Sequence, residues 1–247
     1  MSVAAIYDIH ANLPALQAVL AEVRSARVER LVVGGDVLPG PMPCETLAAL
    51  FDLEIPVQFI QGNGDRAVVE EAQGVDSGAL PEAARDVVRW VARHLPPESV
   101  RRVAAWPKSL RAAVPGLGDV LFCHATPRSD TEIFTRLTPP ERVLPALVEI
   151  DAATVVCGHT HMQFDRRIGS IRVVNAGSVG MPHGQPGAHW LLLGPEIAFR
   201  RTPYDFAAAA ARIQASEYPQ AEDFAARAIL HPRSESEMLA TFAKISM

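Results

Sequence analysis

The chain has 247 residues, of which 49% are hydrophobic, and its formal net charge is −5. This length and hydrophobic fraction suit one large α/β domain or two small ones, while the mixing of acidic and basic residues argues against a stable nucleic-acid partner. No apolar run approaches the roughly 20 residues that a membrane-spanning helix needs, so no membrane partner is expected.

The first part of the chain alternates predicted strands and helices. Short apolar runs predict strands over 3–7, 31–33 and 57–60, and the segments between them predict helices that begin at Leu13 and cover 44–53. Asn12 is the expected N-cap of the first helix. This order indicates a largely parallel sheet.

The middle and the end of the chain contain more strands, followed by helices. Periodicity and turn residues predict the following elements: helices over 81–95, 98–106 and 140–150, and strands over 109–114, 119–123, 153–157, 164–167, 171–174, 189–193 and 196–202. Beyond Tyr204 the pattern is helical, with breaks at Pro219 and Pro232. We therefore assign residues 1–203 to one α/β domain and residues 204–247 to a helical appendage packed on it.

Polar side chains stand at the ends of five of the predicted strands. They are Asp8, His10, Asp36, Asn63, His124, His159 and His161. A single histidine is more often a packed or surface residue than a ligand, and a single aspartate can serve as a turn or cap residue. The Asp-x-His and His-x-His spacings, however, place alternating side chains on one face of an extended segment. Together these ligands are too many for one tetrahedral zinc, but about what two metal ions sharing a carboxylate need.

The order of these residues resembles the calcineurin-like metallophosphoesterase superfamily. The matching blocks are Asp8-x-His10, Gly35-Asp36, Gly62-Asn63-x-Asp65, His124 and Gly158-His159-x-His161, within residues 3 to about 180. The first block, with Asp8-Ile9-His10-Ala11-Asn12, is similar to that of the small bacterial phosphodiesterases. The resemblance implies an α/β fold in which two mixed β-sheets pack as a sandwich flanked by helices, in four layers, with extra C-terminal helices.

The resemblance also implies a dinuclear metal centre. Asp8, His10, Asp36 and His161 would surround one ion, and Asp36, Asn63, His124 and His159 the other, so that Asp36 bridges the two. Imidazole and carboxylate ligands without thiolate favour Mn, Fe, Zn, Ni or Co. A hydroxide that bridges the two ions would then attack phosphorus.

One position departs from the family pattern. The third block of the family reads Gly-Asn-His-Asp, and its histidine is held to protonate the leaving oxygen, whereas this chain has Gly64. Two residues are candidates for a compensating role. His183 could supply a proton, and Arg66 could contact phosphate oxygens through its guanidinium. The alternative is that His183 is a surface histidine and Arg66 a solvated arginine.

The leading functional hypothesis is a phosphodiesterase that acts on small, possibly nucleotide-like, phosphate esters. A phosphomonoesterase or a dinucleoside polyphosphate hydrolase is the enzymatic alternative, and a catalytically weak metal-binding scaffold, as in a eukaryotic retromer subunit, is the alternative of another class. The intact ligand set favours an enzyme, whereas Gly64 favours the scaffold. Cys44, Cys123 and Cys157 form no disulfide framework, so we expect a cytoplasmic protein, and the sequence leaves its oligomeric state open.

Overall fold

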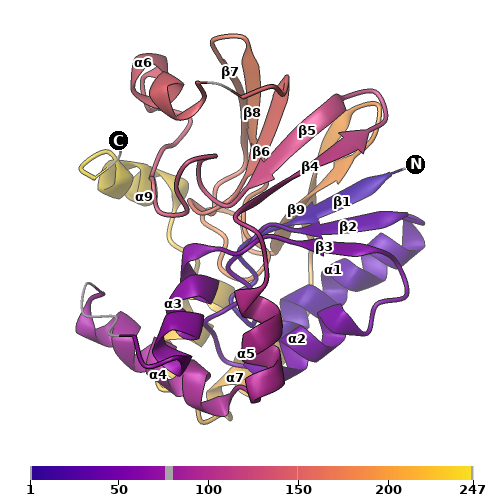
Figure 1. Ribbon diagram of the computed structural model, residues 1–247. Coiled ribbons are helices and arrows are strands. Elements are labelled where there is room, and N and C mark those ends of the chain that lie inside the picture. Colours follow the sequence, from indigo (N-terminus) through magenta and orange to yellow (C-terminus); the bar gives the residue numbers. More distant parts are fainter. Residues whose placement is uncertain (1, 76–79, 149, 246) are drawn as a thin grey trace.

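Two β-sheets pack face to face between layers of helices in the computed structural model, which describes residues 2–75, 80–148, 150–245 and 247 (Figure 1). The first sheet has the strand order β10-β9-β1-β2-β3, and the second has the order β4-β5-β6-β8-β7. Each sheet combines parallel and antiparallel pairs. This arrangement confirms the predicted sandwich of two mixed sheets.

The observed strands follow the predicted ones closely. In the first sheet they are β1 (Val3–Ile6), β2 (Arg30–Val33), β3 (Val57–Phe59), β9 (Ala188–Leu193) and β10 (Ile197–Thr202). In the second sheet they are β4 (Ser109–Val114), β5 (Gly118–Cys123), β6 (Thr154–Cys157), β7 (Phe164–Ile168) and β8 (Ile171–Asn175).

Alternation of side chains along the strands separates the hydrophobic core into layers. In β1, Val3 and Ala5 point toward the second sheet, where they meet Phe122 of β5 in a shared cluster. Ala4 and Ile6 point the other way and pack against the helices. Successive side chains of a strand face opposite sides, so one short apolar run serves both layers.

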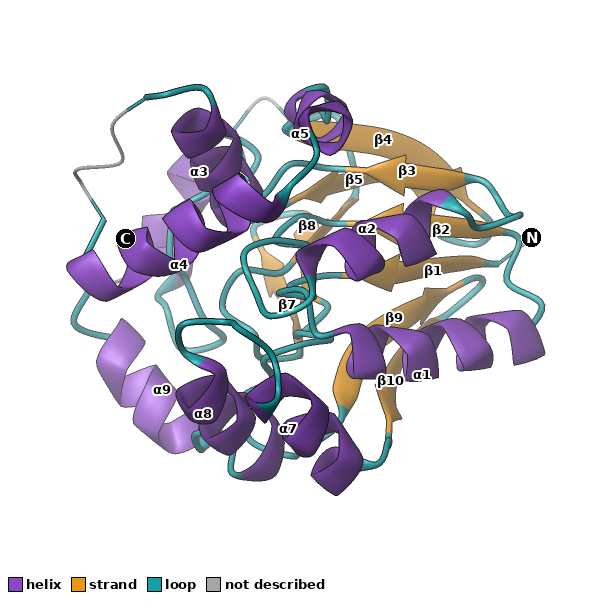
Figure 2. Ribbon diagram, turned by 90° about the horizontal axis from the view of Figure 1, so that it is seen from below, coloured by secondary structure: helices purple, strands orange, loops and turns teal. Residues whose placement is uncertain are grey.

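Helices lie over the outer face of the first sheet, in front of β1, β2 and β9 in Figure 2. Those from the first half of the chain are α1 (Leu13–Ser25), α2 (Pro43–Phe51), α3 (Asn63–Ala72), α4 (Glu82–His94) and α5 (Pro97–Ala104). Asn12 caps α1 as predicted, because its side chain accepts a hydrogen bond from the backbone N–H of Ala15 at 3.3 Å.

Two helices differ from the sequence prediction. The helix α3 was not predicted, because Gly62-Asn63-Gly64 has the composition of a turn. The helix predicted over 140–150 is shorter: α6 (Pro140–Val143) leads into the single turn η1 (Leu144–Ala146), and residue 149 lies outside the described residues. Pro145 explains the early end, since proline cannot donate the hydrogen bond that continues a helix.

The C-terminal helices pack on the α/β body beside α4. They are α7 (Phe206–Gln214), α8 (Ala221–Phe224), the helical segment η2 (Ala225–Leu230) and α9 (Glu235–Phe242). Val87 of α4 belongs to the same buried cluster as Ile213 of α7 and Phe224 of α8. No helix in the described part of the chain is long and apolar enough to cross a membrane.

Candidate metal centre

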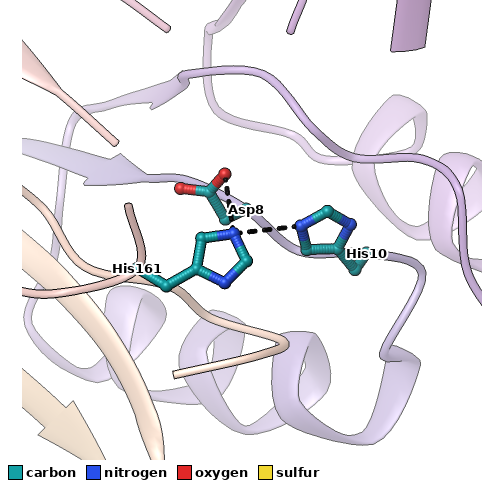
Figure 3. Close-up of side chains that lie close together, drawn as sticks. All are labelled: Asp8, His10 and His161. Carbon is teal, nitrogen blue, oxygen red and sulfur yellow. Dashed lines mark hydrogen bonds and ion pairs between the residues drawn. The ribbon is translucent and has the colours of Figure 1, made fainter. Parts of the chain in front are cut away.

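Two groups of side chains at the sheet edge each bring their possible ligand atoms within 4.8 Å of one another. The first group comprises Asp8 and His10, which follow β1, and His161, which follows β6. Figure 3 shows the imidazole of His161 between the other two side chains. Its Nε2 lies 3.4 Å from Oδ1 of Asp8 and 3.3 Å from Nε2 of His10. Three possible ligand atoms that are far apart in the sequence thus lie close together.

The second group comprises Asp36 after β2, His124 after β5 and His159 after β6. Nε2 of His124 lies 3.5 Å from Oδ1 of Asp36. The other carboxylate oxygen of Asp36, Oδ2, lies 3.9 Å from Nε2 of His10 in the first group. Asp36 therefore presents one oxygen to each group, which is the placement that a bridging carboxylate needs. Asp8 also approaches both groups, since its Oδ1 lies 3.8 Å from Nε2 of His124.

The backbone orients three of the histidines. Nδ1 of His10 lies 3.3 Å from the carbonyl oxygen of Pro39, Nδ1 of His124 lies 3.0 Å from that of Gly34, and Nδ1 of His161 lies 2.8 Å from that of Met181. A protonated Nδ1 that donates to a carbonyl leaves Nε2 as the free ligand atom. In all three rings, this Nε2 faces the candidate ligands.

Asn63, the first residue of α3, adds an amide to the second group. Its Oδ1 lies 3.1 Å from Nε2 of His124, a separation typical of two atoms that bind the same ion. With the amide reversed, its nitrogen would instead donate to His124 and to Nδ1 of His159. Metal binding and a protonated His124 both favour the amide oxygen toward His124, whereas a neutral His124 favours the reversed amide.

Burial of the centre supports a cation there. Asp8 is 0% exposed and Asp36 4% exposed, and Oδ1 of Asp8 has no hydrogen-bond partner among the described residues. A buried carboxylate is costly unless it is paired with a cation or fully hydrogen-bonded. The donor set of carboxylates, imidazoles and one amide fits divalent transition metals.

Burial and mutual charge shift the pKa values of these groups in opposite directions. Burial raises the pKa of Asp36, but the nearby charges of His124 and His10 outweigh it and hold this pKa well below its usual range. Burial lowers the pKa of His124, but Asp36 and Asp8 outweigh it and raise this pKa to about 10. Burial and then the charge of His124 lower the pKa of His159 to about 4. Without metal, the centre therefore keeps a proton on His124, which a bound cation would displace.

The backbone at the centre is strained. Among the described residues other than glycine, the candidate ligands make up most of those with a left-handed backbone: Asp8 (φ 52°), His10 (φ 48°), Asp36 (φ 50°), His159 (φ 67°) and His161 (φ 56°). Side chains with a Cβ rarely adopt this region, and such residues concentrate at functional sites. The strained backbone conformations therefore concentrate at the possible metal ligands, which supports a functional role for this site.

Gly64 lies in the first turn of α3 without a left-handed backbone. The space around it explains why glycine stands there. A Cβ at this position would collide with the carbonyl oxygen of Leu38 and lie 2.9 Å from Cδ of Pro39. The loop after β2 therefore occupies the space that any side chain at position 64 would need.

Arg66 lies beside the centre, but carboxylates surround its guanidinium. Nε lies 2.7 Å from Oδ2 of Asp130, Nη2 lies 3.2 Å from Oδ1 of Asp130, and Nη1 lies 3.2 Å from Oε1 of Glu70. These contacts connect α3 with the loop that follows His124. The phosphate role predicted for Arg66 is untested, and these contacts favour a structural role instead, because the guanidinium would have to leave its partners to reach a phosphate.

His183 stacks on His161, with ring centroids 5.4 Å apart. Burial, followed by the charges of His161 and Arg233, lowers the pKa of His183 to about 3. A histidine with so low a pKa is uncharged at neutral pH and is a poor proton donor. Its role as the compensating acid stays a prediction.

Asp65 supports the centre in a way that the sequence did not reveal. This buried carboxylate accepts hydrogen bonds from the backbone N–H of Leu38 at 2.9 Å and of Gly62 at 3.0 Å. It thereby joins the loop that carries Asp36 to the start of α3, which carries Asn63. Sequence spacing alone could not have separated this role from that of a metal ligand.

Comparison with known families agrees with this geometry. Residues 1–195 match the calcineurin-like phosphoesterase superfamily domain. The chain belongs to this superfamily. The membership agrees with the resemblance carried by the sequence blocks and indicates a phosphoester hydrolase.

Solved structures of low sequence identity share the metallophosphoesterase fold. A hypothetical protein from Pyrococcus horikoshii is similar with a TM-score of 0.78 and 18% identity, over 94% of this chain and 99% of that one. A metallophosphoesterase from Sphaerobacter thermophilus is similar with a TM-score of 0.70 and 24% identity, over 92% of this chain and 97% of that one. A search of curated proteins found no significant match.

Proposed function

We propose that this metallophosphoesterase is a phosphodiesterase that acts on a small phosphate ester and has a dinuclear centre of divalent transition-metal ions, for which manganese is one candidate beside Fe, Zn, Ni and Co. The observation that carries the proposal is the position of Asp36, whose two carboxylate oxygens lie 3.5 Å from Nε2 of His124 and 3.9 Å from Nε2 of His10. Two ions that share this carboxylate would activate a water molecule between them and neutralise the charge of a bound phosphate.

The protein's own residues would hold and orient this chemistry. Asp8, His10 and His161 would hold one ion, and Asn63, His124 and His159 the other, with Asp36 shared between them. The backbone carbonyl groups of Pro39, Gly34 and Met181 would fix three of the rings, so that each Nε2 keeps its direction. Fixed ligands do not need to reorganise during the reaction, which supports catalysis by electrostatic preorganisation.

Metal content and diester turnover test the proposal together. We expect about two equivalents of divalent metal per chain and metal-dependent hydrolysis of bis-p-nitrophenyl phosphate. His161→Ala should lower both, because Nε2 of His161 faces Asp8 and His10. The control is His231→Ala, which removes an exposed imidazole outside both groups.

Three results would contradict the proposal. A single equivalent of metal would exclude the dinuclear centre. Full metal loading without hydrolysis of any phosphate ester would favour the scaffold hypothesis. Faster turnover of p-nitrophenyl phosphate than of the diester would favour a phosphomonoesterase.

A further inference from the structure

A cavity of about 290 Å³ opens beside the candidate metal centre. Its polar end is formed by His10, Asp36 and Asn63, which belong to the centre itself. A group bound by the metal ions would therefore have direct access to this space. Gly64 lines the same cavity and contributes no side chain that would narrow it.

Beyond the centre, the cavity wall is mainly apolar and comes from helices that are distant in the sequence. Val87 and Val88 of α4 form one side, and Phe224 of α8 and Ala228 of η2 contribute from the C-terminal helices. The ring of Tyr218 lines the cavity and packs edge-on against Phe224, with ring centroids 6.0 Å apart. These side chains offer mainly apolar contact area, and among the five only Tyr218 carries a polar group, its hydroxyl.

Three of the polar side chains that line the remote part of the cavity are already paired. Nε2 of Gln220 donates to the carbonyl oxygen of Ala83 at 2.8 Å. Nε of Arg227 lies 2.7 Å from Oδ1 of Asp223 in a largely exposed ion pair. A nucleobase has polar edges that need partners when buried, and here they would compete with these existing pairs, whereas an apolar substituent leaves the pairs intact.

We infer that the cavity receives an apolar ester substituent of the substrate, so that the enzyme selects phosphate esters carrying an aryl or branched alkyl group over nucleotides. This inference rests on the proposed function, because it needs a phosphate group at the metal centre. The size is suitable, since an apolar cavity of about 150 Å³ already holds benzene.

Binding of two small phosphonates and one nucleotide by the metal-loaded protein tests the inference, with affinity rather than turnover as the readout. Titration calorimetry would compare phenylphosphonate, methylphosphonate and adenosine monophosphate. Burial of a phenyl ring is worth a factor of roughly 10 to 100 in affinity, so phenylphosphonate should bind at least about tenfold more tightly than methylphosphonate. Adenosine monophosphate should gain no such factor over methylphosphonate.

Filling the cavity should remove this preference. Ala84 of α4 lines the cavity and is only half-buried, so Ala84→Phe places a ring in the space at little cost to packing. We expect its ratio of phenylphosphonate to methylphosphonate affinity to fall to about one, with methylphosphonate binding unchanged within about twofold. The matched control is Ala83→Phe, at an exposed position that does not line the cavity.

A second pair of variants covers a failure of Ala84→Phe to fold. Ala228→Leu fills the cavity from the η2 side, and Ala226→Leu is its exposed control. Equal affinities of wild type for phenylphosphonate and methylphosphonate would overturn the apolar preference while leaving the proposed function in place. Tighter binding of adenosine monophosphate than of phenylphosphonate would also overturn it. Failure of every ligand to bind the metal-loaded protein would overturn the proposed function, and the inference with it.

Discussion

Gly64→Ala separates two physical effects that act in opposite directions. Gly64 lies within α3, where alanine is ordinarily favoured over glycine by roughly 0.5–1 kcal/mol. An added Cβ, however, would collide with the carbonyl oxygen of Leu38, and it would lie 2.9 Å from Cδ of Pro39 and 3.1 Å from Oδ1 of Asp36. Two of these neighbours belong to the loop backbone or a proline ring, neither of which can rotate away.

Overpacking costs roughly 1–3 kcal/mol, and a collision with a backbone oxygen belongs to the upper half of this range, so about 1–2.5 kcal/mol of destabilisation remains after the helix preference is subtracted. For a chain of this size, each kcal/mol lowers the melting temperature by roughly 2–4 °C, which predicts a decrease of about 2–10 °C. The displaced loop carries Asp36, so the affinity of the centre for metal should fall as well.

Thermal unfolding of the metal-free protein and metal titration would measure the two effects. Gly194→Ala is the matched control: Gly194 lies in the turn between β9 and β10, and an added Cβ there meets no described atom within 4 Å. A melting temperature of Gly64→Ala equal to or above that of wild type, with unchanged metal affinity, would refute the reasoning.

The remaining predictions concern the ligands, the leaving group and Arg66. Asp36→Ala should reduce bound metal at both positions, whereas Asn63→Ala should weaken chiefly one, and elemental analysis that finds two full equivalents in Asp36→Ala would exclude a bridging role. Activity should be readily measured on nitrophenyl diesters and weak on alkyl esters, because position 64 has no side chain that could protonate the leaving group. The slope of log kcat/KM against leaving-group pKa measures this dependence. A shallow slope would mean that another residue supplies the proton. Arg66→Ala should lower the melting temperature by a few degrees at most and leave KM unchanged, since Asp130 and Glu70 already hold the guanidinium, and a tenfold higher KM would instead show contact with phosphate.

The sequence predicted the sheets and the convergence of the candidate ligands because both depend on local patterns. Short apolar runs identify buried strands, and polar residues directly after them mark the edge where strand ends meet. Asp8 and His161 are far apart in the chain, yet each follows a strand, and their side chains lie 3.4 Å apart in the structure.

Features that depend on long-range contacts were not predictable in the same way. The helix α3 begins within a segment of turn composition, and buried Asp65 stabilises its start by accepting from Gly62. Similarly, Tyr218 and Ala228 carry no signal in their own segment that connects them to the metal centre. They line the cavity only because the C-terminal helices pack beside α4.

The left-handed backbone at the candidate ligands has a consequence for how this protein can evolve. A left-handed residue costs up to about 1–2 kcal/mol relative to an ordinary conformation, and less for aspartate, so the set at the centre, with His10 and His159 among them, costs several kcal/mol, a sizeable part of the net stability of a typical domain. In the metal-free protein, replacing one of them by glycine relieves its share of this strain, against the entropy cost of glycine, whereas in the metal-loaded protein the same change also removes the stabilisation by bound metal. Selection for activity must therefore act continuously to retain these residues. A laboratory search scored only on heat resistance in the absence of metal would favour loss of the centre.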